Sequence, residues 1–470
     1  MGVPAAAGLL FRKTHLARLF FGSLLLLIII FTRWFWIDCD GGTPSLMEYG
    51  YFATDEGYYA SGGKNKLIYG RFINALRAAP CTYAISPSSH LLTWFAFLCT
   101  GQNTWAHRLF PFLINTCAWL VLYRFLSRRT PPWLAFLICG ICLLNPFTMV
   151  YGRTACNDTL MASLLLFGYV LTRKRGLLFA FLGGFVFGLG LWIKQSIWAL
   201  FPFGASAAAM APSGRRLPRV GAFLAGFVGS AAIQYGLIRL LIWSDAASQD
   251  ISIERLLDLS DSSYPLPNPF DWSATFRGIS SFPRCPADGL LGVWIALFLV
   301  LPCLLLLRRL TDKPFRWDGR MLLYLAFPLY AAGIIILPVF YAHYYIPLLA
   351  FVPVLWVEAR RDLKRWRGGS LWLTAVLLVS AVAFVLASYH TFVVYPDEAE
   401  GLTPYLSNAY NLPPKIVWCR NGFYILATAM VLLASGLIAR RRRLTFLVVL
   451  GVALSALGVA DLCFYSIPLC

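Results

Sequence analysis

This 470-residue sequence contains little charge: only 13% of its residues are charged, and Asp and Glu together number 21. By contrast, 59% are hydrophobic, 16% are aromatic, and the mean hydropathy is +0.68. These proportions exclude a soluble domain of this length. Because lipid-exposed backbone cannot remain unpaired in hydrocarbon, we predict an all-α, polytopic transmembrane helix bundle.

Several familiar motifs are also absent. The sequence contains no internal repeat, Walker loop or dinucleotide-binding fingerprint, which argues against an ATP-driven transporter built from this chain alone. No small-residue cleavage site follows the first apolar run, Leu16–Ile37, so that run is expected to be a retained anchor. The CGIC at 139–142 and the glycines in LGGFVFGLG at 182–190 lie in apolar stretches, and both fit ordinary helix packing.

Apolar stretches of roughly 20 residues recur along the chain and predict about thirteen transmembrane helices. After Leu16–Ile37, the expected spans are Trp105–Leu126, Pro131–Val150, Cys156–Thr172, Gly176–Trp192, Lys194–Ala211, Val220–Trp243, Gly289–Leu307, Met321–Tyr341, Tyr344–Val357, Leu371–Val394, Phe423–Ala439 and Leu444–Ile467. The shorter piece His90–Cys99 is too brief to cross and is expected at the membrane interface.

Basic residues then predict the orientation, because short cytoplasmic loops are enriched in Lys and Arg. With a cytoplasmic N-terminus and an outer C-terminus, the following basic residues and runs fall on one side: Arg12, Lys13, Arg18, Arg128, Arg129, 173–175, Arg215, Arg216, Arg219, Arg308, Arg309, Lys313, Arg316, Arg320, 360–367 and 440–443. The larger loops 38–104, 244–288 and 395–422 fall on the other side. The net charge of +19 is therefore an orientation signal, and no nucleic-acid partner is expected.

The topology gathers a few polar residues on the outer side. The stretch TDEGYYASGG at 54–63 contains Asp55 and Glu56, while Asp158, Lys194 and His343 each open a predicted span. Ionisable groups at membrane depth are costly unless they are paired or solvated, so each is a candidate functional residue.

Each of these residues also has a simpler explanation when it is taken alone. Asp158 would serve as a helix N-cap, Lys194 or Arg153 as a snorkelling cation, and His343 as an interfacial histidine. Taken together, the set suits one chemistry better. A carboxylate can accept a proton from an acceptor hydroxyl, while cations neutralise a phosphate leaving group. That inventory fits glycosyl transfer from a lipid phosphate sugar.

Several segments in this order resemble the GT-C superfamily of polytopic glycosyltransferases. The nearest branch holds the bacterial aminoarabinose transferases of lipid A and the protein O-mannosyltransferases. The matching segments are DEGYY at 55–59, SPSSHLLTWFAFLCTG at 86–101 followed by AHRLFPFLIN at 106–115, RTACNDTLMASLLLF at 153–167, GLWIKQSIWALFP at 190–202 and AHYYIPLLAF at 342–351. The resemblance implies a GT-C-like catalytic module over residues 1–360, including outer loops 38–104 and 244–288. Residues 361–470 would add C-terminal helices and outer loop 395–422.

The resemblance also implies residue roles in an inverting displacement that releases polyprenyl phosphate. The catalytic set would be Asp55 as base, Glu56 and Asp158, and the donor phosphate set would be Lys194, His343, Tyr344 and Arg153, with His90 and Arg108 lining the cavity. A divalent metal would take its ligands from Asp55, Glu56, Asp158 and His343, although no local ligand spacing establishes one. Relatives often carry a basic residue with paired prolines where this chain has Ser86, Pro87, Ser88 and Ser89.

The expected activity is transfer of a sugar from a polyprenyl (undecaprenyl) phosphate donor to a lipid, glycan or protein acceptor. The expected location is a bacterial inner membrane, with the site facing the periplasm. Two rival functions stay open. A lipid-linked sugar flippase would place ionisable residues near mid-membrane, whereas a polysaccharide polymerase would use the same leaving group and a similar base.

Overall fold

The structure is a computed structural model that describes residues 3–34, 37, 54–72, 86–143, 148, 152, 155–194, 197–247, 302–310 without 304 and 308, 318–336 and 346–363. Within these ranges every regular element is a helix, so the all-α prediction is confirmed there. The elements are α1 (Val3–Thr32), α2 (Thr54–Tyr69), α4 (Pro87–Thr100), α5 (Thr104–Ser127), α6 (Pro132–Leu143), α8 (Asn157–Thr172), α9 (Leu177–Leu189), η2 (Gly190–Trp192), α10 (Ile197–Ala209), η3 (Ser213–Arg215), α11 (Arg216–Ile238), η4 (Arg239–Trp243), α12 (Ser244–Ala247), α16 (Gly319–Ile336) and α17 (Ile346–Leu363).

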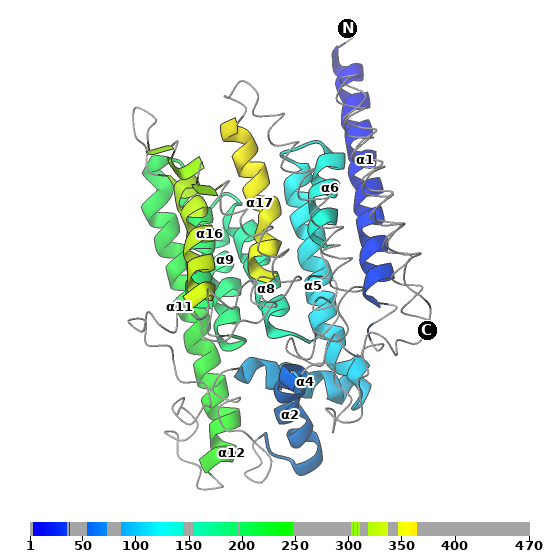
Figure 1. Ribbon diagram of the computed structural model, residues 1–470, viewed down its shortest axis with the longest axis vertical. Helices are drawn as coiled ribbons and strands as arrows, with labels where there is room; N and C mark the ends of the chain where they lie inside the picture. Colours follow the sequence, from blue (N-terminus) through cyan, green and yellow to red (C-terminus); the bar gives the residue numbers. More distant parts are fainter. Residues whose placement is uncertain are drawn as a thin grey trace, which may run out of the picture.

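The longer helices run side by side as a bundle, with α1 along one edge and α11 along the other (Figure 1). Helices α8 and α17 lie between these edges. The short helices α2, α4 and α12 lie at the end of the bundle opposite the N-terminus. We call this the outer end, and we call the end where α1 begins the inner end.

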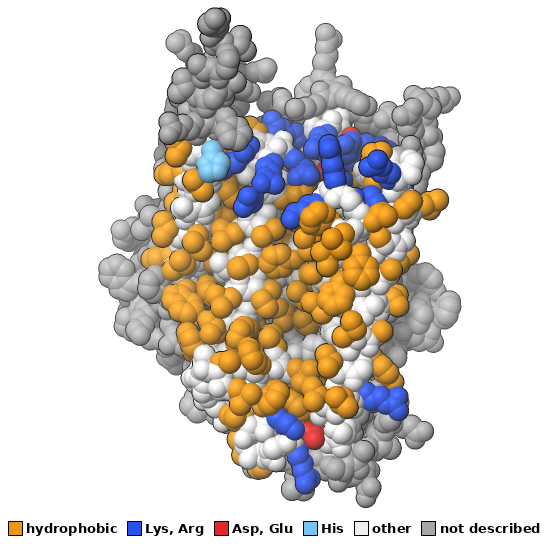
Figure 2. Space-filling view, turned by 180° about the vertical axis from the view of Figure 1, so that it is seen from behind, with side chains coloured by type: hydrophobic (Ala, Val, Ile, Leu, Met, Phe, Trp, Pro, Cys, Tyr) orange, Lys and Arg blue, Asp and Glu red, His pale blue; other side chains and the backbone are white. Residues whose placement is uncertain are grey.

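The surface of the bundle is that of an integral membrane protein. By length and composition, three helices of the described part can cross a membrane: Thr14–Thr32, Trp105–Ser127 and Arg216–Ile242. Figure 2 shows hydrophobic side chains over the middle of one face and Lys and Arg gathered at the inner end above them. This distribution agrees with the predicted orientation. The total of about thirteen spans and the sides of the two termini stay predictions, because much of the chain lies outside the described residues.

Three predicted boundaries differ from the structure by several residues. Helix α1 ends at Thr32, short of Ile37, and the Thr32 hydroxyl donates to the Ile28 carbonyl at 2.7 Å. Helix α10 begins at Ile197, and Lys194 lies outside both η2 and α10. Helix α17 continues past Val357 to Leu363, since arginines from neighbouring segments neutralise its Glu358 and Asp362.

Glycines allow helices α8, α9 and α11 to pack at very short range, as the sequence predicted. A Cβ on Gly183 would lie 2.7 Å from the Gly168 carbonyl of α8, and one on Gly188 would lie 2.6 Å from the Phe227 carbonyl of α11. Gly184 meets the Phe223 carbonyl at still closer range. The packing interpretation of CGIC is confirmed too, because its two cysteines are buried and unbridged.

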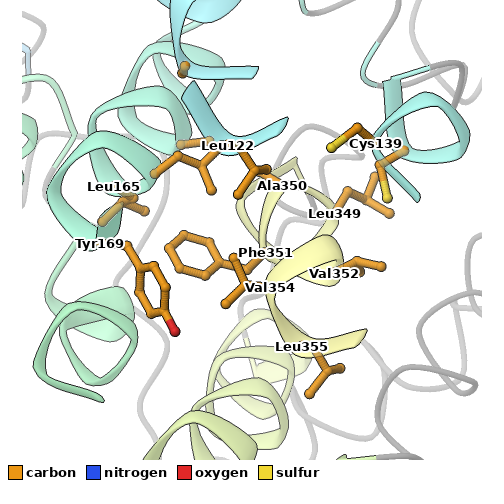
Figure 3. Packing of buried hydrophobic residues seen from close by; sticks show 14 of the residues in the cluster. Leu122, Cys139, Leu165, Tyr169, Leu349, Ala350, Phe351, Val352, Val354 and Leu355 are labelled. Carbon is orange, nitrogen blue, oxygen red and sulfur yellow. The ribbon is translucent and has the colours of Figure 1, made fainter. Parts of the chain in front are cut away.

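Helix α17 runs through the interior of the bundle. Every residue from Ile346 to Ala359 is buried. Figure 3 shows Phe351 of α17 facing Tyr169 of α8, with ring centroids 5.7 Å apart in an edge-to-face pair, and Phe203 of α10 lies 4.7 Å from the same ring. Such aromatic pairs stabilise a core beyond their area alone, by about 1 kcal/mol each. The core therefore fixes α8, whose two ends carry the polar clusters described next.

Candidate functional site

The outer end contains the predicted acidic pair. Asp55 and Glu56 lie in the first turn of α2, a 16-residue helix. Their side chains lie outside what the structure describes, as do Arg153, His343 and Tyr344. The roles predicted for these five residues therefore stay predictions, and the geometry that follows concerns Asp158, Lys194 and their neighbours.

Asp158 and Lys194 form a buried ion pair. The Lys194 Nζ lies 2.5 Å from the Asp158 Oδ2, and the two side chains are only 12% and 2% exposed. Asp158 is in the first turn of α8, whose N-cap is Cys156, and the Cys156 Sγ lies 3.7 Å from the same carboxylate oxygen. Asp158 is therefore not the N-cap of α8, and Lys194 is not an isolated cation: a carboxylate and an ammonium with so little exposure stabilise each other.

Asn157 connects this ion pair to two other segments. Its amide Nδ2 donates to the Ser86 Oγ at 2.8 Å and to the Ile193 carbonyl at 3.0 Å, while the Ser89 Oγ donates to its Oδ1 at 2.7 Å. The Ser86 hydroxyl also donates to the Ile193 carbonyl at 2.8 Å. These bonds tie the start of α4 and the segment before Lys194 to the start of α8.

The sequence did not predict Asn157 as the centre of this site, although a signal was present. Three consecutive polar residues, Asn157, Asp158 and Thr159, open an otherwise apolar helix, and all three are buried. The serines at the position where relatives often carry a basic residue are its partners. In this chain Ser86, the N-cap of α4, and Ser89, in its first turn, therefore supply neutral hydrogen-bonding groups.

Helix α2, which carries the acidic pair, is held at two places. The Gly62 N–H donates to the Nδ1 of buried His90 in α4 at 3.3 Å, and a Cβ on Gly63 would lie 2.6 Å from the Trp94 nitrogen. At its other end, Lys66 lies 3.6 Å from Asp245 of α12. These contacts fix α2 against both α4 and α12. His90, predicted to line the cavity, therefore contacts α2 from its position in α4.

Two buried arginines anchor the chain around the end of α1. Arg108 of α5, predicted as a cavity residue, is fully buried and donates to the Ile37 carbonyl at 2.7 Å. Arg33 was not predicted, because it lies at the end of an apolar run. It donates to the Asn115 Oδ1 and, at 3.4 Å, to the Leu143 carbonyl. Asn115 in turn donates to the Ser163 Oγ of α8 at 2.9 Å, so Arg33 links α1, α5 and α6 and, through Asn115, α8.

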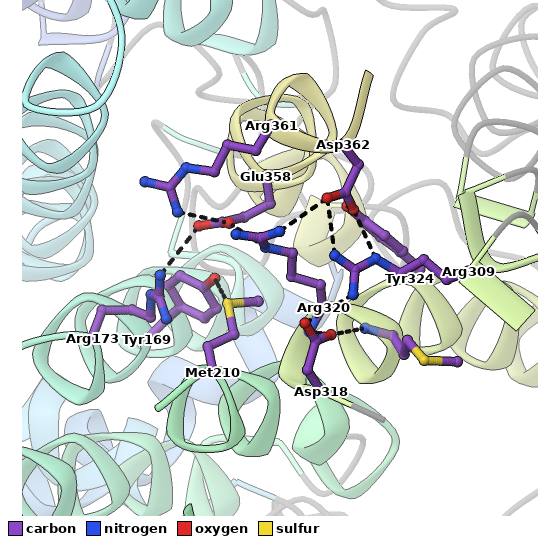
Figure 4. Close-up of polar contacts among 11 residues, drawn as sticks. Tyr169, Arg173, Met210, Arg309, Asp318, Arg320, Tyr324, Glu358, Arg361 and Asp362 are labelled. Carbon is purple, nitrogen blue, oxygen red and sulfur yellow. Dashed lines mark hydrogen bonds and ion pairs between the residues drawn. The ribbon is translucent and has the colours of Figure 1, made fainter. Parts of the chain in front are cut away.

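The inner end contains a second polar cluster, which the sequence did not predict (Figure 4). Glu358 of α17 is 1% exposed and contacts Arg173 at 3.4 Å, Arg320 at 3.2 Å and Arg361 at 3.3 Å. This one carboxylate therefore joins α17 to the end of α8 and to α16. Glu358 lies two residues before the basic run 360–367. That run predicts membrane orientation, but it does not predict that a neighbouring carboxylate is buried and paired.

Asp362 extends this inner cluster by one turn of α17. It accepts two hydrogen bonds from Arg309, both at 2.9 Å, one from Arg320 at 2.9 Å and one from the Tyr324 hydroxyl at 2.8 Å. Burial raises the pKa of the Asp362 carboxyl, but the bonds from Arg309 and Tyr324 outweigh burial and leave the pKa lowered. Nearby, burial and the charge of Arg173 lower the pKa of Arg129 to about 10.

The described side chains include no group of three or more His, Cys, Asp or Glu residues placed to hold a metal ion. Of the four predicted ligands, only Asp158 has a described side chain, and its carboxylate is paired with Lys194. The divalent metal stays a prediction.

Comparison with known proteins completes the description of the site. No protein-family model and no curated protein matches the sequence. The structure is similar to crystal structures of ArnT from Cupriavidus metallidurans. In the apo state of ArnT, 98% of this chain aligns with 76% of that chain at 15% identity and a TM-score of 0.54. In the form bound to undecaprenyl phosphate, the shares are 94% and 75%, again at 15% identity, with a TM-score of 0.51. The resemblance to GT-C glycosyltransferases predicted from the sequence is thus confirmed at the level of the fold, which this chain shares with ArnT.

Proposed function

We propose that this protein is a membrane glycosyltransferase that takes a sugar from a polyprenyl phosphate donor, with undecaprenyl phosphate as the carrier. The acceptor is a lipid, glycan or protein at the outer face of a bacterial inner membrane. The observation that carries the proposal is the buried Asp158–Lys194 pair at the outer end, in a chain with the fold of ArnT. The crystal structure of that relative bound to undecaprenyl phosphate supports a lipid phosphate as the ligand class.

In the proposed reaction the acceptor oxygen attacks the anomeric carbon from the face opposite the phosphate. The new carbon–oxygen bond forms as the bond to the phosphate oxygen breaks, and the electron pair leaves with polyprenyl phosphate. The hydroxyl proton passes to Asp55, assisted by Glu56. Displacement from the opposite face inverts the anomeric configuration.

Lys194 is proposed to meet the phosphate, together with His343, Tyr344 and Arg153. An ammonium has three hydrogen-bond donors, so a lysine that pairs with one carboxylate oxygen can also donate to a phosphate oxygen. Asp158 would hold Lys194 in place before the donor arrives, and Asn157 would hold the start of α8. Such preorganised charge is worth most where water is excluded.

The test uses the purified full-length protein and undecaprenyl phosphate sugars extracted from bacterial membranes. The wild type is expected to release undecaprenyl phosphate and to glycosylate an acceptor in the same extract. Asp55→Asn should abolish release while binding undecaprenyl phosphate normally and melting at the wild-type temperature. Glu56→Gln is the matched neighbour, with a smaller loss expected. Full activity of Asp55→Asn with every donor would remove Asp55 as the base, and movement of an intact donor across vesicles would favour the flippase.

A further inference from the structure

Four cations lie together at the inner end, where the α8–α9 turn meets the start of α11. They are Lys174 and Arg175 on the turn and Arg215 and Arg216 at the start of α11, and we call them the α9–α11 rim. Lys174, Arg175 and Arg215 are exposed, and Arg216 is partly exposed. Figure 2 shows Lys and Arg side chains along this end of the molecule, directly above hydrophobic side chains.

A single buried arginine fixes the geometry of the rim. Arg219, which is 8% exposed, donates to the Gly176 carbonyl at 3.1 Å, to the Lys174 carbonyl at 2.8 Å and to the Thr172 carbonyl. It lies one helical turn after Arg215 on the same face of α11. The turn that carries Lys174 and Arg175 is therefore tied to α11, and the cations of both segments are held close together.

The cations of the rim differ from the arginines around Glu358 and Asp362 in their partners. Arg173, Arg309 and Arg320 pair with Glu358 or Asp362. Within the part of the chain that the structure describes, no ion pair joins Lys174, Arg175 or Arg215 to a carboxylate. Helices α9 and α11 also both begin here, so the positive ends of two helix dipoles add to the field of the side chains.

The surface next to the rim is strongly apolar. Leu177, Leu178 and Leu217 are 52%, 65% and 84% exposed, and they lie within three residues of a rim cation. Along the two helices this surface continues through exposed Phe181, Leu224 and Val228. Because α9 and α11 pack through glycine, their exposed faces adjoin. A headgroup at the rim would thus have a place for acyl chains directly beside it.

We propose that the α9–α11 rim is a binding site for an anionic phospholipid of the inner leaflet. Its phosphate contacts Lys174, Arg175, Arg215 and Arg216, and its acyl chains lie along the apolar face of α9 and α11. The recognition is by charge and shape: a zwitterionic lipid carries its own ammonium beside the phosphate and gains less from this field. The site is independent of the proposed transferase activity.

The test is a titration of the purified full-length protein with phosphatidylglycerol or phosphatidylcholine of the same acyl chains, followed by native mass spectrometry. The wild type is expected to bind phosphatidylglycerol more tightly. The variant Arg175→Gln/Arg215→Gln should weaken that binding about fivefold for each arginine removed. Its binding of phosphatidylcholine should not change.

The control variant is Arg124→Gln/Arg128→Gln, which removes two exposed arginines at the same end of the bundle. These lie at the C-terminal end of α5, where the helix dipole opposes an anion, so a loss below about twofold is expected. Three results would overturn the proposal: equal affinity of the wild type for the two lipids, no loss in the rim variant, or an equal loss in the control.

A second variant separates charge from folding. Arg175→Lys/Arg215→Lys keeps both charges and is expected to retain phosphatidylglycerol binding within about threefold, whatever the melting temperature of the glutamine variant. If the lysine variant loses binding as completely as the glutamine variant, the charge-based site is refuted.

Discussion

At the inner end, Glu358 and Asp362 share several arginines, whereas at the outer end the ion pair between described residues joins Asp158 to a single lysine, Lys194. Arg320 contacts both inner carboxylates, so the loss of one contact leaves each charge with another partner. Asn157, which is next to Asp158 in α8, adds neutral hydrogen bonds with Ser86 and Ser89.

The difference indicates that the two clusters have different roles. A network of shared partners tolerates the loss of a member and locks helices together. A buried pair responds strongly to a new charge, because the low dielectric of a protein interior screens that charge only weakly. An anionic phosphate arriving at the outer end would therefore change the balance around Lys194, while the inner cluster would hold α8, α16 and α17 unchanged.

The largest expected effect is that of Lys194→Met. It leaves the Asp158 carboxylate buried without its ammonium, and the loss in unfolding free energy is expected to be about 3–5 kcal/mol. Asp158→Asn added to it removes the orphaned charge and should recover most of the loss. Chemical unfolding in detergent measures both. Wild-type stability of Lys194→Met would show that the pair is not a tight one.

A smaller loss is expected for Glu358→Gln, about 2 kcal/mol, because the arginines it leaves are partly exposed and Arg320 keeps its contact with Asp362. The matched control is Arg361→Gln, whose side chain is 39% exposed. That change should cost less than about 1 kcal/mol. If Glu358→Gln destabilised the protein more than Lys194→Met, the contrast between the shared arginines of the inner end and the Asp158–Lys194 pair would be wrong.

Asn157→Ala tests the neutral part of the outer site. It removes three hydrogen bonds and leaves the Ser89 hydroxyl to find another acceptor, while the Ile193 carbonyl keeps its bond from Ser86. We expect a loss of about 1–2 kcal/mol in unfolding free energy. Ser88→Ala, which removes a bond to Gln234 at 3.0 Å in a part-buried position, is the milder comparison. Equal losses in the two variants would remove Asn157 from the centre of the site.

The smallest effect is a dependence of stability on pH from Asp362. Its pKa is lowered in the folded protein, so its contribution is fully present above the ordinary aspartate pKa and is lost as the pH falls through the folded value. The melting temperature should therefore decrease less steeply for Asp362→Asn than for the wild type as the pH is lowered from neutral to strongly acidic values. Parallel curves would contradict the lowered pKa.

The sequence predicted the membrane fold and the kinds of residue at the site, but not how they pair. Asp158 and Lys194 were both identified, yet their contact joins residues 36 positions apart and depends on the packing of α8 against the segment after η2. Amino-acid composition and residue spacing do not predict such a tertiary contact. Arg33 and Glu358 were missed for a related reason: Arg33 lies in an apolar run and Glu358 lies between an apolar run and a basic one, and the overall character of those runs does not indicate a single residue with a specific tertiary contact.

The central claim is that the outer pair, and not the inner cluster, serves the lipid phosphate. It is tested most directly by titrating undecaprenyl phosphate into the wild type, Lys194→Met/Asp158→Asn and Glu358→Gln, each at a temperature where it is folded. The double variant is expected to bind at least about tenfold more weakly, as for loss of a charge-assisted hydrogen bond, while Glu358→Gln binds like the wild type. Wild-type affinity in the double variant, or an equal loss in Glu358→Gln, would contradict the claim.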